Sequence, residues 1–422
     1  MSSNGNGFNA PHTHDTTESD HQPGSTTSGS KVAVLLCGYG EVEQYQEFAD
    51  YNERALNLLA SKFIPLPKSI TPLMGKILEF TDRREWSNQQ QYHSPHNEIF
   101  EAQRAGIEHV LQHQFGDRVG VFKAFNFCEP HLPHQVLERV KAAGFDQVVI
   151  FPLLVVDSIF TSGLALKQIN EALGSDVGWI KGMRYLPSFA DRVDYHRRMA
   201  AHIEARLQDL SGTYAPSQIG IMLLNHGSPY EAKGYETGIR ESVSLYLSVR
   251  EHLIEKYPLI SLGWMNHDTP GRWTTPDMNQ AAQNLLGLGA RALVYAPIGF
   301  ATENHETMLD VGYSIKKFQD KAECLHLDCL NEDPVFLAMA AKWITPMITE
   351  LLGDSESAHS HDDHAHVEAA PQHHHAAHDD HHDTHPQAAV ATLPNRNRDL
   401  HQKLEGSQGH HHHHGPGGHH HH

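Results

Sequence analysis

The segment 296–310 holds the residues of this chain best suited to chemistry. It starts at the end of an apolar run and becomes, within a few residues, dense in carboxylate and imidazole side chains. If a helix begins near Glu303, then Glu303, Glu306 and Asp310 share one helical face. With the imidazole of His305 beside them, these oxygen donors suit a divalent ion such as Fe²⁺, Co²⁺ or Zn²⁺. The solvated acidic face of an ordinary helix is the alternative, and the pattern leaves both open.

His226 is a second candidate, because it closely follows the apolar run 219–224 and precedes a glycine. In open α/β sheets ligands bind at the carboxyl ends of the strands, which predicts an imidazole that faces a cleft. An unperturbed pKa of about 6.5 lets an imidazole accept protons near neutrality. The alternative is a loop histidine bonded to a backbone carbonyl, and position alone does not decide between the two.

Two aromatic side chains are placed where they can bind a flat ligand. Trp273 lies in the proline-containing segment 263–276, and we favour it as a pocket wall, whereas Trp264 fits the core equally well. Tyr39 stands between two glycines after the apolar run 32–36. The glycines allow a tight turn out of a strand, which places this tyrosine at the carboxyl edge of the expected sheet.

Parallel strands are needed to bring these side chains to one edge. Continuous apolar runs indicate strands that are buried on both faces, as in a parallel sheet, and the stretches of helix formers between them indicate crossover helices. We expect strands at 32–36, 119–125, 147–151, 219–224 and 292–295, and helices at 98–114, 133–143 and 334–352. The predicted fold class is therefore α/β.

The second half of the chain repeats the plan of the first. Residues 134–144 lie over 279–289 at an offset of 145, and at the same offset residues 149–153 lie over 294–298. The shared order of helix, glycine, strand and proline predicts two related Rossmann-like domains with parallel sheets. An amphipathic helix, stopped by Gly353, is expected to close the ordered part of the chain.

Composition sets the predicted domain bounds. Residues 1–30 are polar and residues 353–422 are rich in histidine and aspartate, so we expect both to be disordered. Between them we place an N-terminal half over 31–209 and a C-terminal half over 218–352. The two histidine blocks at 410–422 are compatible with an expression tag. The histidine-rich tail as a whole is predicted to be a metal reservoir, with a purely solubilising role as the alternative.

Charge, cysteine content and hydropathy argue against several classes of protein. The formal net charge is −19 and no basic stripe is present, which argues against a nucleic-acid partner. The four cysteines show no disulfide framework, so we expect a reducing, cytoplasmic location. Cys324 and Cys329 are a weak metal signal, and isolated buried cysteines are the alternative. The longest apolar run, 148–156, is shorter than the roughly 20 residues that span a bilayer, so no transmembrane segment is predicted, and peripheral membrane association stays open.

Taken together, these motifs resemble ferrochelatase, the family that inserts Fe²⁺ into protoporphyrin IX. The resemblance covers residues 31–350 and rests on Tyr39-Gly40, the Ser/Thr/Gly-rich loop 151–163, and the segments 225–229, 273–276, 300–307 and 330–334. It implies a porphyrin bound between two Rossmann-like domains, with Ser162 in the substrate-binding loop. It implies no organic cofactor, a divalent metal substrate with Fe²⁺ first, and, because the four-cysteine site of some members is absent, no iron–sulfur cluster.

The resemblance also assigns roles to the candidate residues. Metallation requires that two pyrrole protons leave while the metal sheds its waters. His226 is expected to accept these protons or handle the metal at one face of the porphyrin. Glu306, together with Glu303 and Asp310, is expected to manage metal or protons at the opposite face. The aromatic rings of Tyr39 and Trp273 are expected to hold the macrocycle.

The chain departs from the family's pattern at two positions. Asn304 stands where an imidazole is usual, so that imidazole is either missing or moved by one position to His305, and Ser314 stands where an acid commonly continues the metal path. The motif His226-Gly227-Ser228 also resembles the smaller chelatases of the sirohydrochlorin and cobalt pathway. Two alternatives therefore stay open, namely a chelatase of that type and a non-catalytic tetrapyrrole or metal carrier on the chelatase fold.

Overall fold

The computed structural model describes residues 29–41, 53–55, 57, 72, 94–158, 161–230, 237–267 and 271–354. The predicted disorder of the leader 1–30 and of the tail 353–422 falls outside these residues, apart from two residues at each inner end. Within the described residues the chain forms two four-stranded parallel sheets with helices packed on them. The predicted α/β class is confirmed.

Both sheets have the same strand order. The first has the order β2-β1-β3-β4 and contains β1 (Val32–Gly38), β2 (Val119–Phe125), β3 (Gln147–Pro152) and β4 (Gly182–Tyr185). The second has the order β6-β5-β7-β8 and contains β5 (Ile219–His226), β6 (Leu259–Met265), β7 (Ala292–Ala296) and β8 (Glu323–His326). The central strands β1, β3 and β7 are buried along their whole length, which explains their continuous apolar runs. The prediction of two related halves is confirmed.

Helices connect the strands. Those before the second sheet are α4 (His96–Phe115), α5 (Pro133–Ala142), α6 (Ser162–Leu173) and α7 (Val193–Leu207). The later ones are α8 (Ile239–Glu251), α9 (Met278–Gly287), α10 (Val311–Phe318) and α11 (Pro334–Leu352). A π-helical turn, η5 (Glu306–Asp310), leads into α10, and short 3₁₀ turns form η3 (Gly116–Arg118) and η4 (Pro216–Gln218). All three predicted helices are present, and Gly353 ends α11 in the left-handed region, with a φ of 71°.

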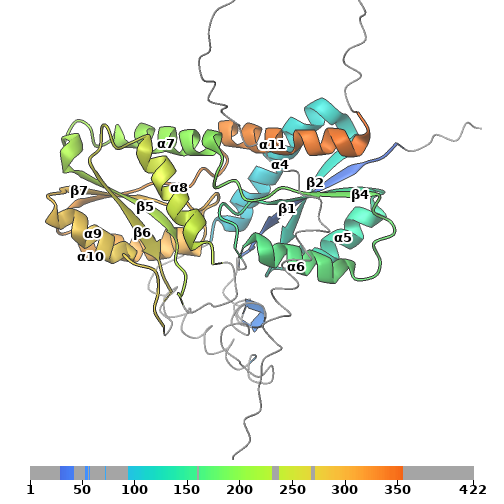
Figure 1. Ribbon diagram of the computed structural model, residues 1–422, viewed down its shortest axis with the longest axis horizontal. Helices are drawn as coiled ribbons and strands as arrows, with labels where there is room; N and C mark the ends of the chain where they lie inside the picture. The colour runs from blue at the N-terminus through green and yellow to red at the C-terminus, as the bar shows by residue number, and fades with distance from the viewer. Residues whose placement is uncertain are drawn as a thin grey trace, which may run out of the picture.

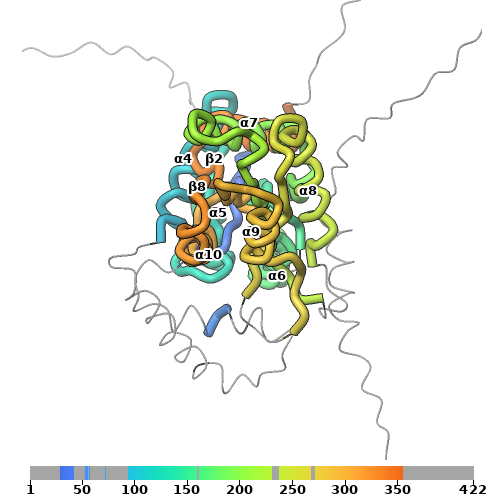
Figure 2. The backbone as a smooth tube through the Cα atoms, turned by 90° about the vertical axis from the view of Figure 1, so that its left-hand side faces the viewer, coloured from blue at the N-terminus to red at the C-terminus, as the bar shows by residue number. Residues whose placement is uncertain are grey.

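Helices α7 and α11 each pack against elements of the other half of the chain. α7 packs against α8, and α11 packs against α4 and the strands β1, β3 and β4. Figure 1 shows α7 above the second sheet and α11 above the first, and Figure 2 again places α7 on the side opposite α9 and α10. As a result, side chains of α4, α7, α8 and α11 belong to one hydrophobic core that both halves share. The outer faces, under α5 with α6 and under α9 with α10, have cores of their own.

Helix α11 is, in the described part of the chain, the one helix long and apolar enough to cross a membrane by length and composition. Its side chains Phe336, Trp343, Ile344 and Ile348 are buried in the shared core. Packing therefore accounts for the apolar composition of this helix. The absence of a transmembrane segment stays a prediction.

Candidate functional site

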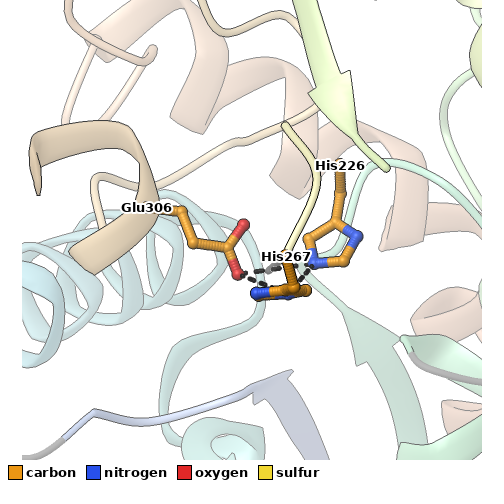
Figure 3. A group of neighbouring side chains, drawn as sticks. All are labelled: His226, His267 and Glu306. Carbon is orange, nitrogen blue, oxygen red and sulfur yellow. Dashed lines mark hydrogen bonds and ion pairs between the residues drawn. The ribbon is translucent and has the colours of Figure 1, made fainter. Parts of the chain in front are cut away.

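Three side chains from the second half converge at the carboxyl edge of its sheet. His226 is the last residue of β5, His267 lies two residues after the end of β6, and Glu306 begins η5. Nε2 of His226 lies 3.1 Å from Nε2 of His267. Oε1 of Glu306 lies 3.4 Å from the first nitrogen and 3.5 Å from the second. Figure 3 shows the three side chains pointing toward one another.

The backbone around His226 fixes which of its nitrogens faces this cluster. Nδ1 of His226 donates to the carbonyl oxygen of Gly227 at 2.6 Å, so Nε2 is the atom directed at the cluster. The two strand ends approach closely, since a Cβ atom at Gly227 would lie 1.8 Å from Oδ1 of Asn266. Glycine is therefore required at 227 to bring the two histidines together. Both readings of His226 that the sequence left open hold, because one nitrogen binds a carbonyl and the other faces the cluster.

The three groups shift each other's pKa. Burial by itself lowers the pKa of His226, but the Glu306 carboxylate, with the Gly227 carbonyl and Asp310, raises it to about 9. Burial likewise raises the pKa of Glu306, yet the nearby His226, His267 and His305 lower it to about 2. At neutral pH the pair is therefore an imidazolium and a carboxylate. About a third of the His226 side chain is exposed (37%), so solvent can reach this ion pair.

The geometry of the cluster suits a divalent ion. Donor atoms bound at about 2.0–2.1 Å in a tetrahedral arrangement are separated by roughly 3.3 Å. The observed separations of 3.1, 3.4 and 3.5 Å are close to that value. Among the described residues, His226, His267 and Glu306 are the group of three metal-ligating side chains that lie near enough to hold one ion. Two imidazoles and one carboxylate that leave coordination positions open are a ligand set typical of Fe²⁺.

Glu303 does not belong to this cluster, and the predicted acidic face of Glu303, Glu306 and Asp310 is wrong. The helix begins two residues after Glu303 and its first turn is π-helical, so the α-helical spacing does not apply. The side chain of Glu303 is buried, and its Oε2 accepts from the backbone N–H of Cys329 at 3.0 Å. Its Oε1 lies 3.9 Å from Nε2 of His326. Glu303 therefore faces the strand β8 side of the loop.

His305 and Asp310 flank the cluster without joining it. Both act on it through charge, because His305 lowers the pKa of Glu306 and Asp310 raises the pKa of His226. Neither is among the three side chains near enough to share one ion with the others. Their predicted roles as metal ligands remain predictions.

Asn304, one of the two departures from the family's pattern, caps the helix that carries Glu306. Its Oδ1 accepts from the N–H of Thr307 at 3.0 Å, and Oγ1 of Thr307 accepts from the N–H of Asn304 at 2.9 Å. This reciprocal pair satisfies N–H groups that have no partner within the helix. Ser314, the other departure, is buried and its hydroxyl lies 3.1 Å from that of Tyr295. Both residues therefore have a structural role.

Glu41 binds the same helix start from the other half. Glu41 lies three residues after the end of β1, and its carboxyl group accepts from the N–H of His305 at 2.9 and 3.1 Å and from the hydroxyl of Ser94 at 2.8 Å. The helix N-terminus and these hydrogen bonds favour the ionised form of the acid. Burial outweighs them and raises the pKa of Glu41 to about 8, so the acid is mostly protonated at neutral pH. No local pattern in the sequence indicates this contact, because it joins residues far apart in the chain.

A cavity lies next to the cluster, between the halves. It is lined by Tyr39, His96 and Phe100 from the first half and by His226, Phe300 and Asn304 from the second, together with the loop residues Leu153, Val155, Ser158 and Thr161. The walls are largely apolar, with few polar groups, as is usual for ligand sites. Burial and the charge of Glu306 raise the pKa of Tyr39, so its phenol stays protonated.

Two predicted substrate-binding residues lie away from the cavity wall. Ser162 is fully buried and its hydroxyl donates to the carboxylate of Asp157, so it does not face the cavity. Its neighbours Ser158 and Thr161 line the cavity instead. Trp273 is half-buried, and its ring meets that of His267 edge-on at 5.7 Å between centroids.

Sequence reasoning missed His267. His267 lies in the same segment as Trp273 and Trp264, and the two tryptophans were the candidates in that segment. Trp264 belongs to the core, with 3% of its surface exposed. A signal was present, because His267 closely follows a strand that is parallel to β5 and paired with it. The carboxyl ends of paired parallel strands meet at one edge, so His226 and His267 were bound to be neighbours.

The family model and the curated relatives point to one family. A family model described as Ferrochelatase matches residues 31–348. The ferrochelatase of Synechococcus elongatus is 26% identical over 318 residues, which cover 73% of this chain and 80% of that protein. The ferrochelatase of Gloeothece citriformis is 25% identical over 335 residues, covering 76% and 83%. Among solved structures, SirB from Bacillus subtilis with Fe³⁺ aligns with a TM-score of 0.43 and 10% identity, covering 78% of this chain and 98% of that one.

Proposed function

The chain belongs to the ferrochelatase family, and we propose that it inserts Fe²⁺ into a porphyrin with His226, His267 and Glu306 as the groups that handle metal and protons. As a member of the family it is a metal chelatase, a lyase that acts on a porphyrin and a divalent metal ion. The observation that carries the assignment of residues is the convergence of two imidazoles and one carboxylate beside an apolar cavity.

The metal ion is a substrate, and the cluster gives it a first binding place. His267 and Glu306 offer borderline and hard donors, and the open side of the cluster leaves positions for water. Because Glu306 is ionised at neutral pH, it attracts the cation. The set of two histidines and one carboxylate supports Fe²⁺ as the metal.

His226 has to lose its own proton before it can accept one from a pyrrole. In the free protein the Glu306 carboxylate keeps His226 protonated at neutral pH, since the pKa of this imidazole is raised to about 9. A divalent ion at Glu306 and His267 repels that proton and lowers the pKa of His226. The lone pair on Nε2 is then available beside the cavity. Metal binding therefore prepares the base, and proton transfer by such a base is typically worth on the order of 10²–10⁴ in rate.

The first half supplies the opposite wall for the macrocycle. Tyr39 stacks on Phe127 with 5.7 Å between ring centroids, and both rings lie beyond the strand ends of the first sheet. A largely apolar wall suits a flat aromatic ligand. Trp273 supports the site from the second half through its contact with His267.

The proposal extends to cofactors, location and partners. As the family resemblance implies, the chain works without an organic cofactor, and it works without an iron–sulfur cluster because its four cysteines do not form a four-cysteine motif. It resides in the cytoplasm, in keeping with free cysteines at all four positions. Peripheral contact with a membrane is compatible with the proposal, and a nucleic-acid partner is not expected from the acidic net charge of −19.

The carrier alternative rested on Asn304 and Ser314, and the hydrogen bonds of both residues weaken it. The alternative of a sirohydrochlorin or cobalt-type chelatase rested on His226-Gly227-Ser228 and stays open. Quenching of porphyrin fluorescence on metal insertion separates the functions. With protoporphyrin IX, we expect quenching that depends on enzyme and is fastest with Fe²⁺ among Fe²⁺, Co²⁺, Ni²⁺ and Zn²⁺. Tight porphyrin binding without insertion of any of these metals would mean a carrier. Insertion of Co²⁺ into sirohydrochlorin, with none into protoporphyrin, would mean the second type of chelatase.

A further inference from the structure

His96 is a buried imidazole that the proposed reaction does not use. It is the first residue of α4, only 5% of its surface is exposed, and it lines the cavity together with Tyr39 and His226. Its ring lies against the rings of Phe100 and Phe125, with centroids 5.9 and 6.3 Å away. It belongs to the half of the molecule opposite the cluster of His226, His267 and Glu306.

The hydrogen bonds of His96 determine which nitrogen holds a lone pair. Nδ1 lies 3.0 Å from the carbonyl oxygen of Glu303, and a carbonyl can only accept, so Nδ1 carries the hydrogen. Burial lowers the pKa of His96 to about 4, so the ring is neutral. Nε2 therefore holds a lone pair, and this buried atom has no hydrogen-bond partner among the described residues. Buried polar atoms of this kind normally have a partner.

We propose that Nε2 of His96 is an axial ligand for the metal ion of the metallated tetrapyrrole. The inference rests on the proposed function. Histidines that bind metals almost always donate their other ring N–H to a carbonyl or carboxylate, which orients the ring and fixes the tautomer. The bond from Nδ1 to the carbonyl of Glu303 is such an arrangement.

Charge decides between a metal inside the macrocycle and a free ion. A divalent ion on the buried, aromatic side of His96 would bring an uncompensated charge into an apolar environment, which is costly. Inside a porphyrin that has lost two protons, the same ion is part of a neutral complex. The ionised carboxylate that suits the free ion lies at Glu306, on the other half. His96 therefore fits the product, whereas His226, His267 and Glu306 fit the metal substrate.

The test uses the full chain and one equivalent of zinc protoporphyrin IX, whose Soret band shifts to the red when an axial nitrogen binds. We expect the shift with the unchanged protein and with His109→Leu, a control at an exposed position of the same helix. We expect His96→Leu to lose the shift and to bind the probe about tenfold more weakly, a factor that corresponds to about 1.4 kcal/mol. In His96→Ala, added imidazole should restore the shift, which separates ligation from a defect in folding.

Two results would overturn the inference. The first is a shift that survives in His96→Leu, and its loss in His226→Ala would then assign the axial nitrogen to His226 instead. The second is that imidazole restores nothing in a His96→Ala protein whose circular dichroism is that of the unchanged chain. In each case the proposed function still stands. If the unchanged chain binds neither zinc protoporphyrin nor the free porphyrin, the proposed function fails together with the inference.

Discussion

The two halves of the molecule carry the same sheet but place different side chains at its carboxyl edge. At three corresponding positions the second half has His226, His267 and Glu306, whereas the first half has Tyr39, Cys128 and Thr161. The scaffold is thus repeated, and the imidazole and carboxylate groups are present at these positions in one copy only. In the first half, the carboxyl edge of the sheet contributes the phenol of Tyr39 and the hydroxyl group of Thr161 to the cavity wall.

Strand pairing supports this correspondence. β1 pairs with β3 in the same register as β5 pairs with β7, which places Tyr39 and His226 at matching points. The pairing of β1 with β2 and of β5 with β6 makes Cys128 the counterpart of His267. Glu306 lies 14 residues after the start of β7 at Ala292, and Thr161 lies 14 residues after the start of β3 at Gln147. The positions match because the backbone matches, so the side chains alone account for the difference.

Electrostatics shows what that difference does. In the second half, the mutual attraction of Glu306 and His226 overcomes burial, lowering the pKa of the carboxylate and raising that of the imidazole. In the first half, burial dominates and raises the pKa of Tyr39, so that its phenol remains uncharged. A repeated fold therefore forms one wall whose charges suit a cation and one uncharged wall that suits a flat aromatic ring.

Glu306→Gln should have a large effect on activity. The change keeps the shape of the side chain but removes the charge that attracts the metal and raises the pKa of His226. We expect the rate of metal insertion to fall about 100- to 1,000-fold, within the range of acid–base catalysis. Nuclear magnetic resonance titration of His226 should show its pKa falling from about 9 toward the ordinary value for histidine. If the pKa of His226 is unchanged in Glu306→Gln, the ion pair between Glu306 and His226 is contradicted.

His267→Ala tests whether the second imidazole binds the metal. We expect the KM for Fe²⁺ to rise about 10- to 100-fold, in the range observed when groups around a bound metal are removed, with a smaller change in kcat. Cys128→Ala is the matched change at the corresponding position of the first half, and we expect less than a twofold effect there. Equal effects of the two changes would remove the distinction between the halves.

Glu41→Gln tests the contact between the halves through the dependence of stability on pH. The pKa of Glu41 in the folded state, about 8, is above its ordinary value near 4.5. The stabilisation from the protonated acid is therefore fully present below pH 4.5 and is lost as the pH rises through 8. Since each pKa unit corresponds to about 1.4 kcal/mol, this loss is a few kcal/mol. Glutamine does not ionise, so thermal unfolding of the variant should lack this part of the decline. If stability declines equally with pH in the unchanged protein and in Glu41→Gln, the raised pKa of Glu41 is refuted.

Removal of residues 355–422 should have the smallest effect on turnover. If the histidine-rich tail gathers metal, its removal lowers metal loading at limiting Fe²⁺ but leaves the rate unchanged at saturating metal. Equilibrium dialysis measures the first quantity and porphyrin fluorescence the second. A lower rate at saturating metal would show that the tail acts on the site itself, and unchanged loading would leave only a solubilising role.

The fold followed from the sequence because its signals are local. The buried strands are continuous apolar runs, and the repeat of helix, glycine, strand and proline is visible in the printed chain. His226 and Glu306 were identified for the same reason, since each follows a strand. Glu303 was misplaced because the helix begins later than expected and its first turn is π-helical. Contacts such as that of Glu41 with His305 depend on how the halves pack, which no local pattern records.

The most direct test of the account compares His226→Ala with Tyr39→Phe, the corresponding position of the first half. Insertion of Fe²⁺ into protoporphyrin IX is measured for both under saturating conditions. We expect His226→Ala to lower kcat about 100-fold or more, in the range of an acid–base group. Tyr39→Phe keeps the ring and should change kcat less than about fivefold. Full activity in His226→Ala, or equal losses in the two variants, would contradict the assignment of metal and proton handling to the second half.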